Sequence, residues 1–301
     1  MRRTLLLILF ALALAIPAPA GIIQVVQASF ATGSDTRAIQ ELTAYRASQG
    51  ITPEYLEAFS WLARAEFQSQ NYLPAEKFSQ AIYTFSVEQL KKQPLDKEPH
   101  LPTALGAAIE IQAGTLTAQG RRSEAVTYLQ EQAKVFGATS ILPRIRKNLL
   151  LLTLEGKPAP PLDGVSLPKG KPALLFFWAH WCPDCKSEIP ILARIKAEYA
   201  PQGLVLLAPT QKYGYVAGGV DAAPAVETAY IEQVRRTYYA AVIDGPAPVS
   251  EANFTRYGAS TTPTLVLVDR MGIVRMYHPG AMKYEALKEA VEKVVKNGGT
   301  K

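Results

Sequence analysis

The spacing of apolar residues divides the 301-residue chain into two parts of different character. From about residue 35 to residue 154, apolar positions recur at intervals of three and four residues. The segment is rich in Ala, Gln, Glu, Leu and Lys and contains no convincing strand pattern. This periodicity is typical of amphipathic helices that pack on one another. We therefore expect an all-helical domain over residues 35–154.

Polar turns join these expected helices in pairs. The helices share the same apolar period and cover residues 54–68, 73–90, 105–119, 124–136 and 142–154. Turns at 69–72 and 120–123 make two helical hairpins of the first four, and the Pro-rich segment 94–102 forms a loop between the hairpins. The hairpins resemble tetratricopeptide repeats, with their Ala and aromatic positions displaced by a residue or so.

Strand and helix patterns alternate in the rest of the chain, after the stiff, Pro-rich segment 157–161. The expected strands are short apolar runs at 174–178, 204–207, 264–269 and 274–277. Helical spacing follows at residues 186–199, 229–238 and 284–295. The Gly- and Tyr-rich segment 209–219 suggests a mobile or substrate-contacting loop. This order predicts an α/β sandwich over residues 157–301, with a central mixed sheet flanked by helices.

The only two cysteines of the chain stand three residues apart in Trp181-Cys182-Pro183-Asp184-Cys185, between an expected strand and an expected helix. Pro183 falls in the first helical turn, where a missing N–H costs nothing. Cys182 is then at the helix N-terminus, whose partial positive charge favours a thiolate. The pair indicates thiol–disulfide exchange, with Cys182 as the nucleophile and Cys185 as the resolving thiol.

A structural disulfide or half of a zinc site would also place two cysteines together. Two cysteines this close are too few for a disulfide framework, and a zinc site needs about four ligands where the chain has only three histidines. We expect no metal and no cofactor beyond a redox-active Cys182–Cys185 disulfide. The net charge of +6 is dispersed, without interleaved aromatic residues, so nucleic-acid binding is not expected.

The N-terminus has the composition of an export signal. Arg2 and Arg3 precede an uncharged Leu/Ala-rich run, and small residues follow at 18–20. Because no charge occurs between Arg3 and Asp35, an uncleaved membrane anchor is the alternative. Residues 1–28 are therefore expected to be a signal peptide or anchor. Either would place the rest of the chain outside the cytoplasm, in the periplasm of a bacterium, with membrane contact only through the anchor.

The sequence around the cysteines resembles the Trp-Cys-x-x-Cys-x-x-Glu-x-Pro signature of TlpA/ResA-like thiol–disulfide oxidoreductases. This chain reads Trp181-Cys182-Pro183-Asp184-Cys185-Lys186-Ser187-Glu188-Ile189-Pro190. Thr262-Pro263, before an apolar strand, matches the proline that is cis in thioredoxin folds and faces the redox pair. The resemblance covers about residues 157–296 and implies a thioredoxin-like fold there.

The resemblance also implies a substrate-binding surface. The Thr262 backbone would lie beside the nucleophilic cysteine and pair with an extended substrate, as in β-augmentation. Pro263, Trp181 and Pro183 are expected to complete this surface, with Trp181 covering the disulfide.

Two further residues are candidates for proton handling. Glu188 would accept the Cys185 proton if it is partly buried, whereas a solvated carboxylate on a surface helix is the alternative. His180 would support the thiolate if protonated, whereas a solvent-facing side chain is its alternative. Lys186 favours the Cys182 thiolate, and Asp184 opposes it by like charge.

These observations favour an enzyme that reduces protein disulfides, rather than an oxidase or isomerase, because relatives of this type often reduce. Its expected partners are protein thiols or disulfides, a redox protein that supplies or accepts electrons, and a protein bound by the helical domain. A non-catalytic adaptor is a second class. A thiol peroxidase is a third, but it needs a Thr shortly before its reactive cysteine, where this chain has Ala179 and His180.

Overall fold

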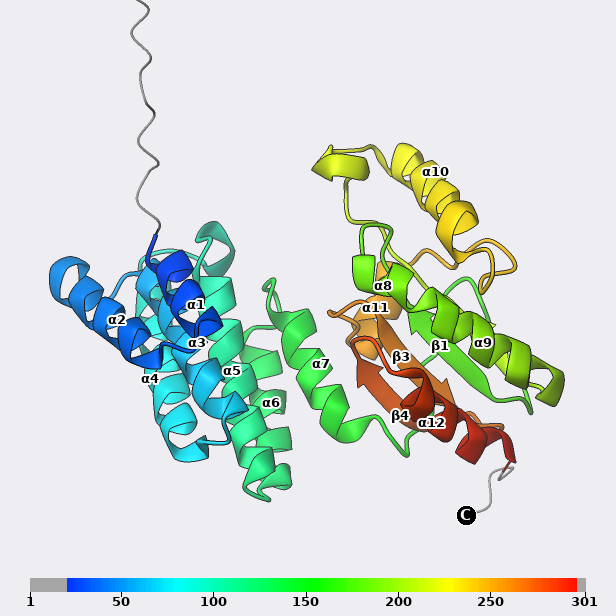
Figure 1. The fold of residues 1–301 in the computed structure, drawn as a ribbon, viewed down its shortest axis with the longest axis horizontal. Helices are drawn as coiled ribbons and strands as arrows, with labels where there is room; N and C mark the ends of the chain where they lie inside the picture. Colours follow the sequence, from blue (N-terminus) through cyan, green and yellow to red (C-terminus); the bar gives the residue numbers. More distant parts are fainter. Residues whose placement is uncertain (1–20, 297–301) are drawn as a thin grey trace, which may run out of the picture.

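The structure is a computed structural model that describes residues 21–296, a helical half followed by a half built on a β-sheet (Figure 1). The helices of the first half are α1 (Ile22–Ala31), α2 (Asp35–Gln49), α3 (Pro53–Gln68), α4 (Tyr72–Leu90), α5 (Leu101–Ala118), α6 (Arg122–Val135) and α7 (Leu142–Thr153). A short 3-10 turn, Leu95–Lys97, precedes α5.

The two predicted helical hairpins are present as α3–α4 and α5–α6. Thr52 caps α3 by accepting a hydrogen bond from the Tyr55 N–H. Helix α5 begins at Leu101, earlier than expected, because Pro102 lies in its first turn, where proline is tolerated, instead of ending the preceding loop. The apolar faces meet in a core whose fully buried members include Leu56, Ile82, Leu105, Ile109 and Leu129.

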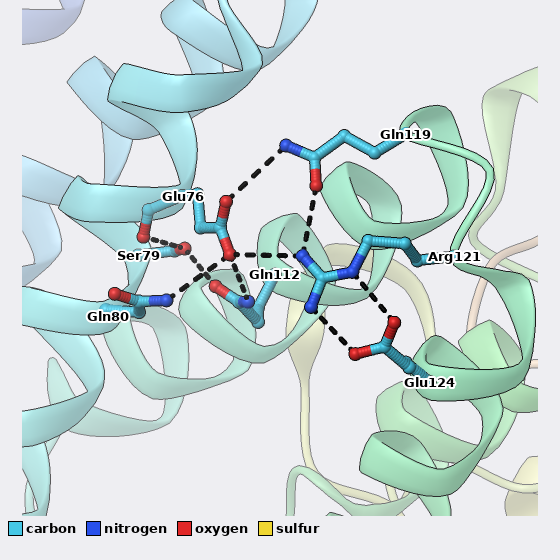
Figure 2. A network of polar contacts seen from close by, with 7 residues as sticks. All are labelled: Glu76, Ser79, Gln80, Gln112, Gln119, Arg121 and Glu124. Carbon is cyan, nitrogen blue, oxygen red and sulfur yellow. Dashed lines mark hydrogen bonds and ion pairs between the residues drawn. The ribbon is translucent and has the colours of Figure 1, made fainter.

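Polar side chains connect α4, α5 and α6 at the edge of this core (Figure 2). Glu76 on α4 accepts hydrogen bonds from Gln112 and Gln119, both at 3.4 Å, and lies 3.8 Å from Arg121. Arg121 in turn pairs with Glu124 at 2.7 Å. Exposed ion pairs contribute little stability individually, so the apolar core holds the hairpins together.

Helix α1 belongs to the packed helical half, which differs from the expectation for residues 1–28. Ile22, Ile23 and Val26 are at most 8% exposed and lie in the same core as α3 and α5. The end of the apolar N-terminal run therefore serves as a core-facing helix. The remainder of the predicted leader, residues 1–20, lies outside the described residues. Within the part of the chain that the structure describes, no helix has the length and hydropathy needed to span a bilayer.

The second half contains one mixed sheet with strands in the order β2-β1-β3-β4. Its elements are β1 (Ala173–Phe177), α8 (Pro183–Ser187), α9 (Ile189–Tyr199), β2 (Val205–Leu207), α10 (Pro224–Val234), a π-helical turn (Arg235–Tyr239), α11 (Glu251–Tyr257), β3 (Thr264–Val268), β4 (Val274–Pro279) and α12 (Tyr284–Lys296). Strand β1 pairs parallel with β2 and antiparallel with β3, and β3 pairs antiparallel with β4. The predicted sandwich is confirmed.

Helices cover both faces of the sheet. Successive side chains of β1 point to opposite faces. Leu174 and Phe176 lie in a core with residues of α9, α10 and α12, whereas Leu175 and Phe177 lie in a second core with residues of α11. Every residue of β1 is therefore buried, and the strand that leads to the cysteine pair is held on both sides.

The helix expected over residues 186–199 is in fact two helices, α8 and α9, that meet at Glu188. Pro190 explains the break, because it has no N–H to donate to the carbonyl of Lys186. In the first turn of α9 that missing donor needs no partner. The break places Glu188 at a junction between two helices, directly after the cysteine pair.

Helix α7 contacts both halves (Figure 1). Ile145 is buried in the helical core, whereas Leu150 and Leu154, at the C-terminal end of α7, pack into the second core of the sheet half. Gly258, which follows α11 with a φ of +57°, approaches α7 closely: a Cβ at this position would lie 2.8 Å from the Lys147 backbone nitrogen. Only glycine combines this conformation with this approach.

Candidate redox active site

The cysteine pair lies where β1 leads into α8. Cys182 and Cys185 form a disulfide with their Cα atoms 5.3 Å apart. Cys182 is the N-cap of α8, and Pro183 follows in the first turn, as predicted. The Cys185 N–H donates a hydrogen bond to Cys182 Sγ at 3.0 Å. The sulfur thus lies at the positive end of the helix, an arrangement that stabilises a thiolate once the disulfide is reduced.

Thr262-Pro263 lies directly against this disulfide. The peptide bond between the two residues is cis, as the resemblance implied. Pro263 is buried immediately before β3, and Thr262 is partly exposed. The Thr262 carbonyl oxygen lies 3.4 Å from Cys182 Sγ. The structure therefore brings these two distant segments of the sequence together at the reactive sulfur.

The disulfide itself is almost inaccessible, because Cys182 and Cys185 are 1% and 0% exposed. Two neighbours face solvent: Trp181 is 46% exposed, and Pro183 is also exposed. The Trp181 ring packs edge-on against Tyr213, with ring centroids 5.4 Å apart. Trp181 and Pro183 therefore form an exposed apolar surface beside the disulfide.

Glu188 lies inside the protein, one helical turn after Cys185. Its side chain is 2% exposed, which excludes the alternative of a solvated surface carboxylate. Burial raises the pKa of Glu188, and the hydrogen bond that its Oε1 accepts from the Met282 N–H at 3.1 Å opposes this only in part. A buried carboxyl group with a raised pKa, one turn from a thiol pair in the sequence, is a candidate for proton exchange with that pair.

The alternative that His180 faces solvent is wrong. Its side chain is 1% exposed and its Nε2 lies 3.2 Å from Glu227 Oε1. Three tyrosine rings surround it edge-on, Tyr213, Tyr215 and Tyr230, with centroids 5.3–5.6 Å from the imidazole. Burial lowers the pKa of His180, although the hydrogen bond to Glu227 acts in the opposite direction. A neutral imidazole gives the Cys182 thiolate no electrostatic support.

Glu227, on α10, was not predicted from the sequence. It is 1% exposed and accepts hydrogen bonds from the Tyr213 and Gly214 N–H groups at 2.5 and 2.9 Å, in addition to its contact with His180. These bonds hold the middle of the Gly- and Tyr-rich segment 209–219, where Tyr213 packs against Trp181. In the sequence, Glu227 is only part of an acidic, Ala-rich stretch before the helix expected at 229–238, whereas α10 begins at Pro224. Nothing in the sequence linked Glu227 to His180.

The charged residues next to the cysteines in the sequence are Asp184 and Lys186. Asp184 is exposed in the first turn of α8. The Lys186 ammonium lies over the Tyr238 ring, 4.2 Å from its centroid. Among residues 21–296, no three His, Cys, Asp or Glu side chains gather as metal ligands would.

Comparison with known proteins agrees with this geometry. Residues 165–295 match the family model described as a thioredoxin-like domain. The thiol:disulfide interchange protein DsbE of Pseudomonas aeruginosa is 29% identical over 147 residues, which cover 45% of this chain and 72% of that protein. The thiol-disulfide oxidoreductase ResA of Geobacillus thermodenitrificans is 26% identical over 179 residues, which cover 60% of this chain and 89% of that protein.

Among solved structures, a thiol:disulfide interchange protein of the thioredoxin family from Chlorobium tepidum aligns with 47% of this chain and 99% of its own, at 19% identity and a TM-score of 0.36. The matched region of this chain is a thioredoxin-like domain with relatives among thiol–disulfide oxidoreductases, which confirms the resemblance seen in the cysteine motif.

Proposed function

We propose that this chain reduces disulfides of proteins outside the cytoplasm, with Cys182 as the attacking thiol and Cys185 as the resolving thiol. The position of Cys182 Sγ carries this proposal, because the sulfur lies between the N-terminus of α8 and the Thr262 carbonyl. The first contact stabilises a thiolate, and the second marks where an extended substrate backbone would run.

The reaction begins after a dithiol donor has reduced the Cys182–Cys185 disulfide. The Cys182 thiolate attacks one sulfur of the substrate disulfide and forms a mixed disulfide, while the other substrate sulfur leaves as a thiolate. The Cys185 thiolate then attacks Cys182 Sγ, which restores the intramolecular disulfide and releases the second substrate thiolate. Two electrons pass from the cysteine pair to the substrate in each cycle.

Glu188 is the group that we assign to the Cys185 proton. It is buried on the turn that follows Cys185, and its pKa is raised by burial. The carboxylate would take the proton from the Cys185 thiol as that thiol becomes the attacking group. The acid so formed would later return a proton to a departing thiolate.

Substrate recognition is assigned to the rim around the sulfur. Thr262 would offer backbone groups to the substrate strand, and Pro263 fixes the direction of that segment. Trp181 and Pro183 would contact the side chains next to the substrate cysteine, because both are exposed and apolar beside the disulfide. A redox protein that supplies electrons, and a protein partner on the helical domain, complete the proposal.

Reduction of insulin by dithiothreitol, catalysed by the chain from Gly21 onward, tests this function. A start at Gly21 keeps α1 complete, whereas removal of residues 1–28 would delete most of this helix. We expect Cys182→Ser to abolish turnover and Cys185→Ser to accumulate a mixed disulfide with insulin. A Cys185→Ser variant that turns over normally would contradict the assigned order.

The reduction potential of the pair tests the direction. A value near about −270 mV would fit a reductase, whereas a value near about −120 mV would show an oxidant.

A further inference from the structure

A cleft of about 560 Å³ lies in the helical half, between α3, α5 and α7. Its walls are mostly apolar and include Phe67, Ile111 and Leu151. The volume is in the range of small-molecule sites. None of its lining residues belongs to the redox site, so the cleft stands apart from the proposed function.

Positive charge exceeds negative charge at this cleft. Glu110 on α5 accepts hydrogen bonds from Arg144 Nε at 2.7 Å and from Lys147 Nζ at 2.8 Å, both on α7. Burial raises the pKa of Glu110, but the two cations outweigh it and lower the pKa to about 2. Among the described residues that line the cleft, Glu110 is the only acidic one, and this anion is already engaged by two cations.

Arg64, on α3, is the second cation that lines the cleft, besides Arg144. Its Nε is buried without a hydrogen-bond partner in the described part of the chain. Burial lowers the pKa of Arg64, and repulsion from Arg144 lowers it further. Glu110 and Glu57 attract Arg64 and act in the opposite direction. Glu110 is already hydrogen-bonded to its two cations on α7, and Glu57 is paired with His100 at 2.8 Å. A partly buried guanidinium whose neighbouring carboxylates are engaged elsewhere is costly, and an anion bound beside it in the cleft would reduce that cost.

The position of Arg64 also fixes where such an anion would lie. Arg64 lines both this cleft and a smaller one between α1 and α3. Its guanidinium stacks over Trp61, 4.9 Å from the ring centroid. The contact restrains the side chain at the cleft, and a guanidinium can bind a carboxylate through two N–H donors.

We propose that this cleft binds a monocarboxylate with an apolar body, such as a fatty acid. Its carboxylate lies at Arg64, near Arg144, and its chain lies along Phe67, Ile111 and Leu151. The cationic wall and the apolar walls determine the orientation of the ligand, and neither wall alone would select an amphipathic molecule.

Isothermal titration calorimetry of the full chain in detergent-free buffer tests the proposal. Decanoate should bind, whereas decanol lacks the charged head and butyrate lacks most of the tail. Each of these two should bind about tenfold more weakly or worse. Arg64→Met keeps the apolar stem of the side chain and removes its charge, so it should weaken decanoate binding about tenfold and leave decanol binding unchanged. Arg37→Met, at an exposed arginine of α2, is the matched control and should bind decanoate like the wild type.

A second variant, Leu151→Asp, tests the proposal independently in case Arg64→Met does not fold. Leu151 is 43% exposed, so Leu151→Asp should fold while it places a like charge on the cleft wall and abolishes decanoate binding. Equal decanoate affinity in the wild type, Arg64→Met and Leu151→Asp would overturn the proposal. So would the absence of any decanoate binding by the wild type. Neither result affects insulin reduction, which tests the other half of the molecule.

Discussion

Glu110 in the helical half is partly buried, at 30% exposed, and Glu188 in the thioredoxin-like half is buried, at 2% exposed, but the surroundings of the two carboxyls are opposite. Glu110 contacts Arg144 and Lys147, and its pKa falls to about 2. Glu188 is hydrogen-bonded to a backbone N–H, and burial raises its pKa. The comparison shows that neighbours decide whether a buried carboxyl is a fixed anion or a group that can exchange protons.

The largest expected effect is on the rate of the resolving step, which should depend on Glu188 and not on Glu110. Glu188→Gln should slow the resolving step about 100-fold, because the Cys185 thiol loses its proton acceptor. In the wild type the rate should fall as the pH drops through the raised pKa of Glu188, above the ordinary value of 4.5, and the variant should lack this inflection. Stopped-flow measurement of mixed-disulfide decay across pH checks both points.

The control for that prediction is Glu285→Gln, at an exposed position of α12. Glu110→Gln should also leave the rate unchanged. If Glu188→Gln has the pH–rate curve of the wild type, then Glu188 is only a buried structural residue.

The second prediction concerns the free energy of unfolding, which should depend on Glu110 and Glu188 in opposite ways. Glu110→Gln should lower the free energy of unfolding by about 2 kcal/mol at neutral pH, because two cations lose their anion. The lowered pKa of Glu110 means that its contribution is complete above pH 4.5 and is lost as the pH falls toward 2. Glu188 has a raised pKa, so its effect has the opposite sign, and folding is favoured as the pH falls through that pKa.

Urea unfolding followed by far-UV circular dichroism, repeated from neutral to acid pH, measures these slopes. Glu188→Gln should show no loss of stability at neutral pH. A similar loss of stability in Glu110→Gln and Glu188→Gln would mean that the two carboxyls contribute equally to folding at neutral pH.

A third, smaller effect concerns the contact that joins the two halves. Gly258→Ala should destabilise the fold by about 1–2 kcal/mol, because a Cβ would meet the Lys147 backbone nitrogen at 2.8 Å and the residue has a positive φ. Gly120→Ala is the matched control, since Gly120 has a φ of +79° with nothing within 4 Å of a Cβ. Equal losses in the two variants would show that the close approach adds nothing.

The smallest effect compares one exposed apolar residue in each half. Trp181→Ala should lower kcat/KM for insulin severalfold, because Trp181 is 46% exposed beside the disulfide, but not for a small-molecule disulfide. Leu151→Ala, at a residue of similar exposure in the helical half, should change neither value. If both variants reduce insulin like the wild type, then protein recognition does not depend on the Trp181 rim.

Much of the fold and of the redox site could be predicted from the sequence, because both depend on local patterns. The strands, both hairpins and the cysteine pair follow from apolar spacing and from a short motif. The ionisation of Glu110 and the burial of His180 could not be predicted, because their partners Arg144 and Glu227 are 34 and 47 residues away. Helix α1 was missed for another reason: an apolar run near the N-terminus has the same composition whether it enters a core or a membrane.

The close contact between Gly258 and α7 affects how this protein would bind its substrates. Two modules on a flexible tether bring a captured molecule to a reactive group at an effective concentration set by tether length. Here the packed contact replaces the tether, and a molecule held by the helical half would be presented to Cys182 from one direction and at one distance. Shape, instead of linker reach, would then decide which captured disulfides can react.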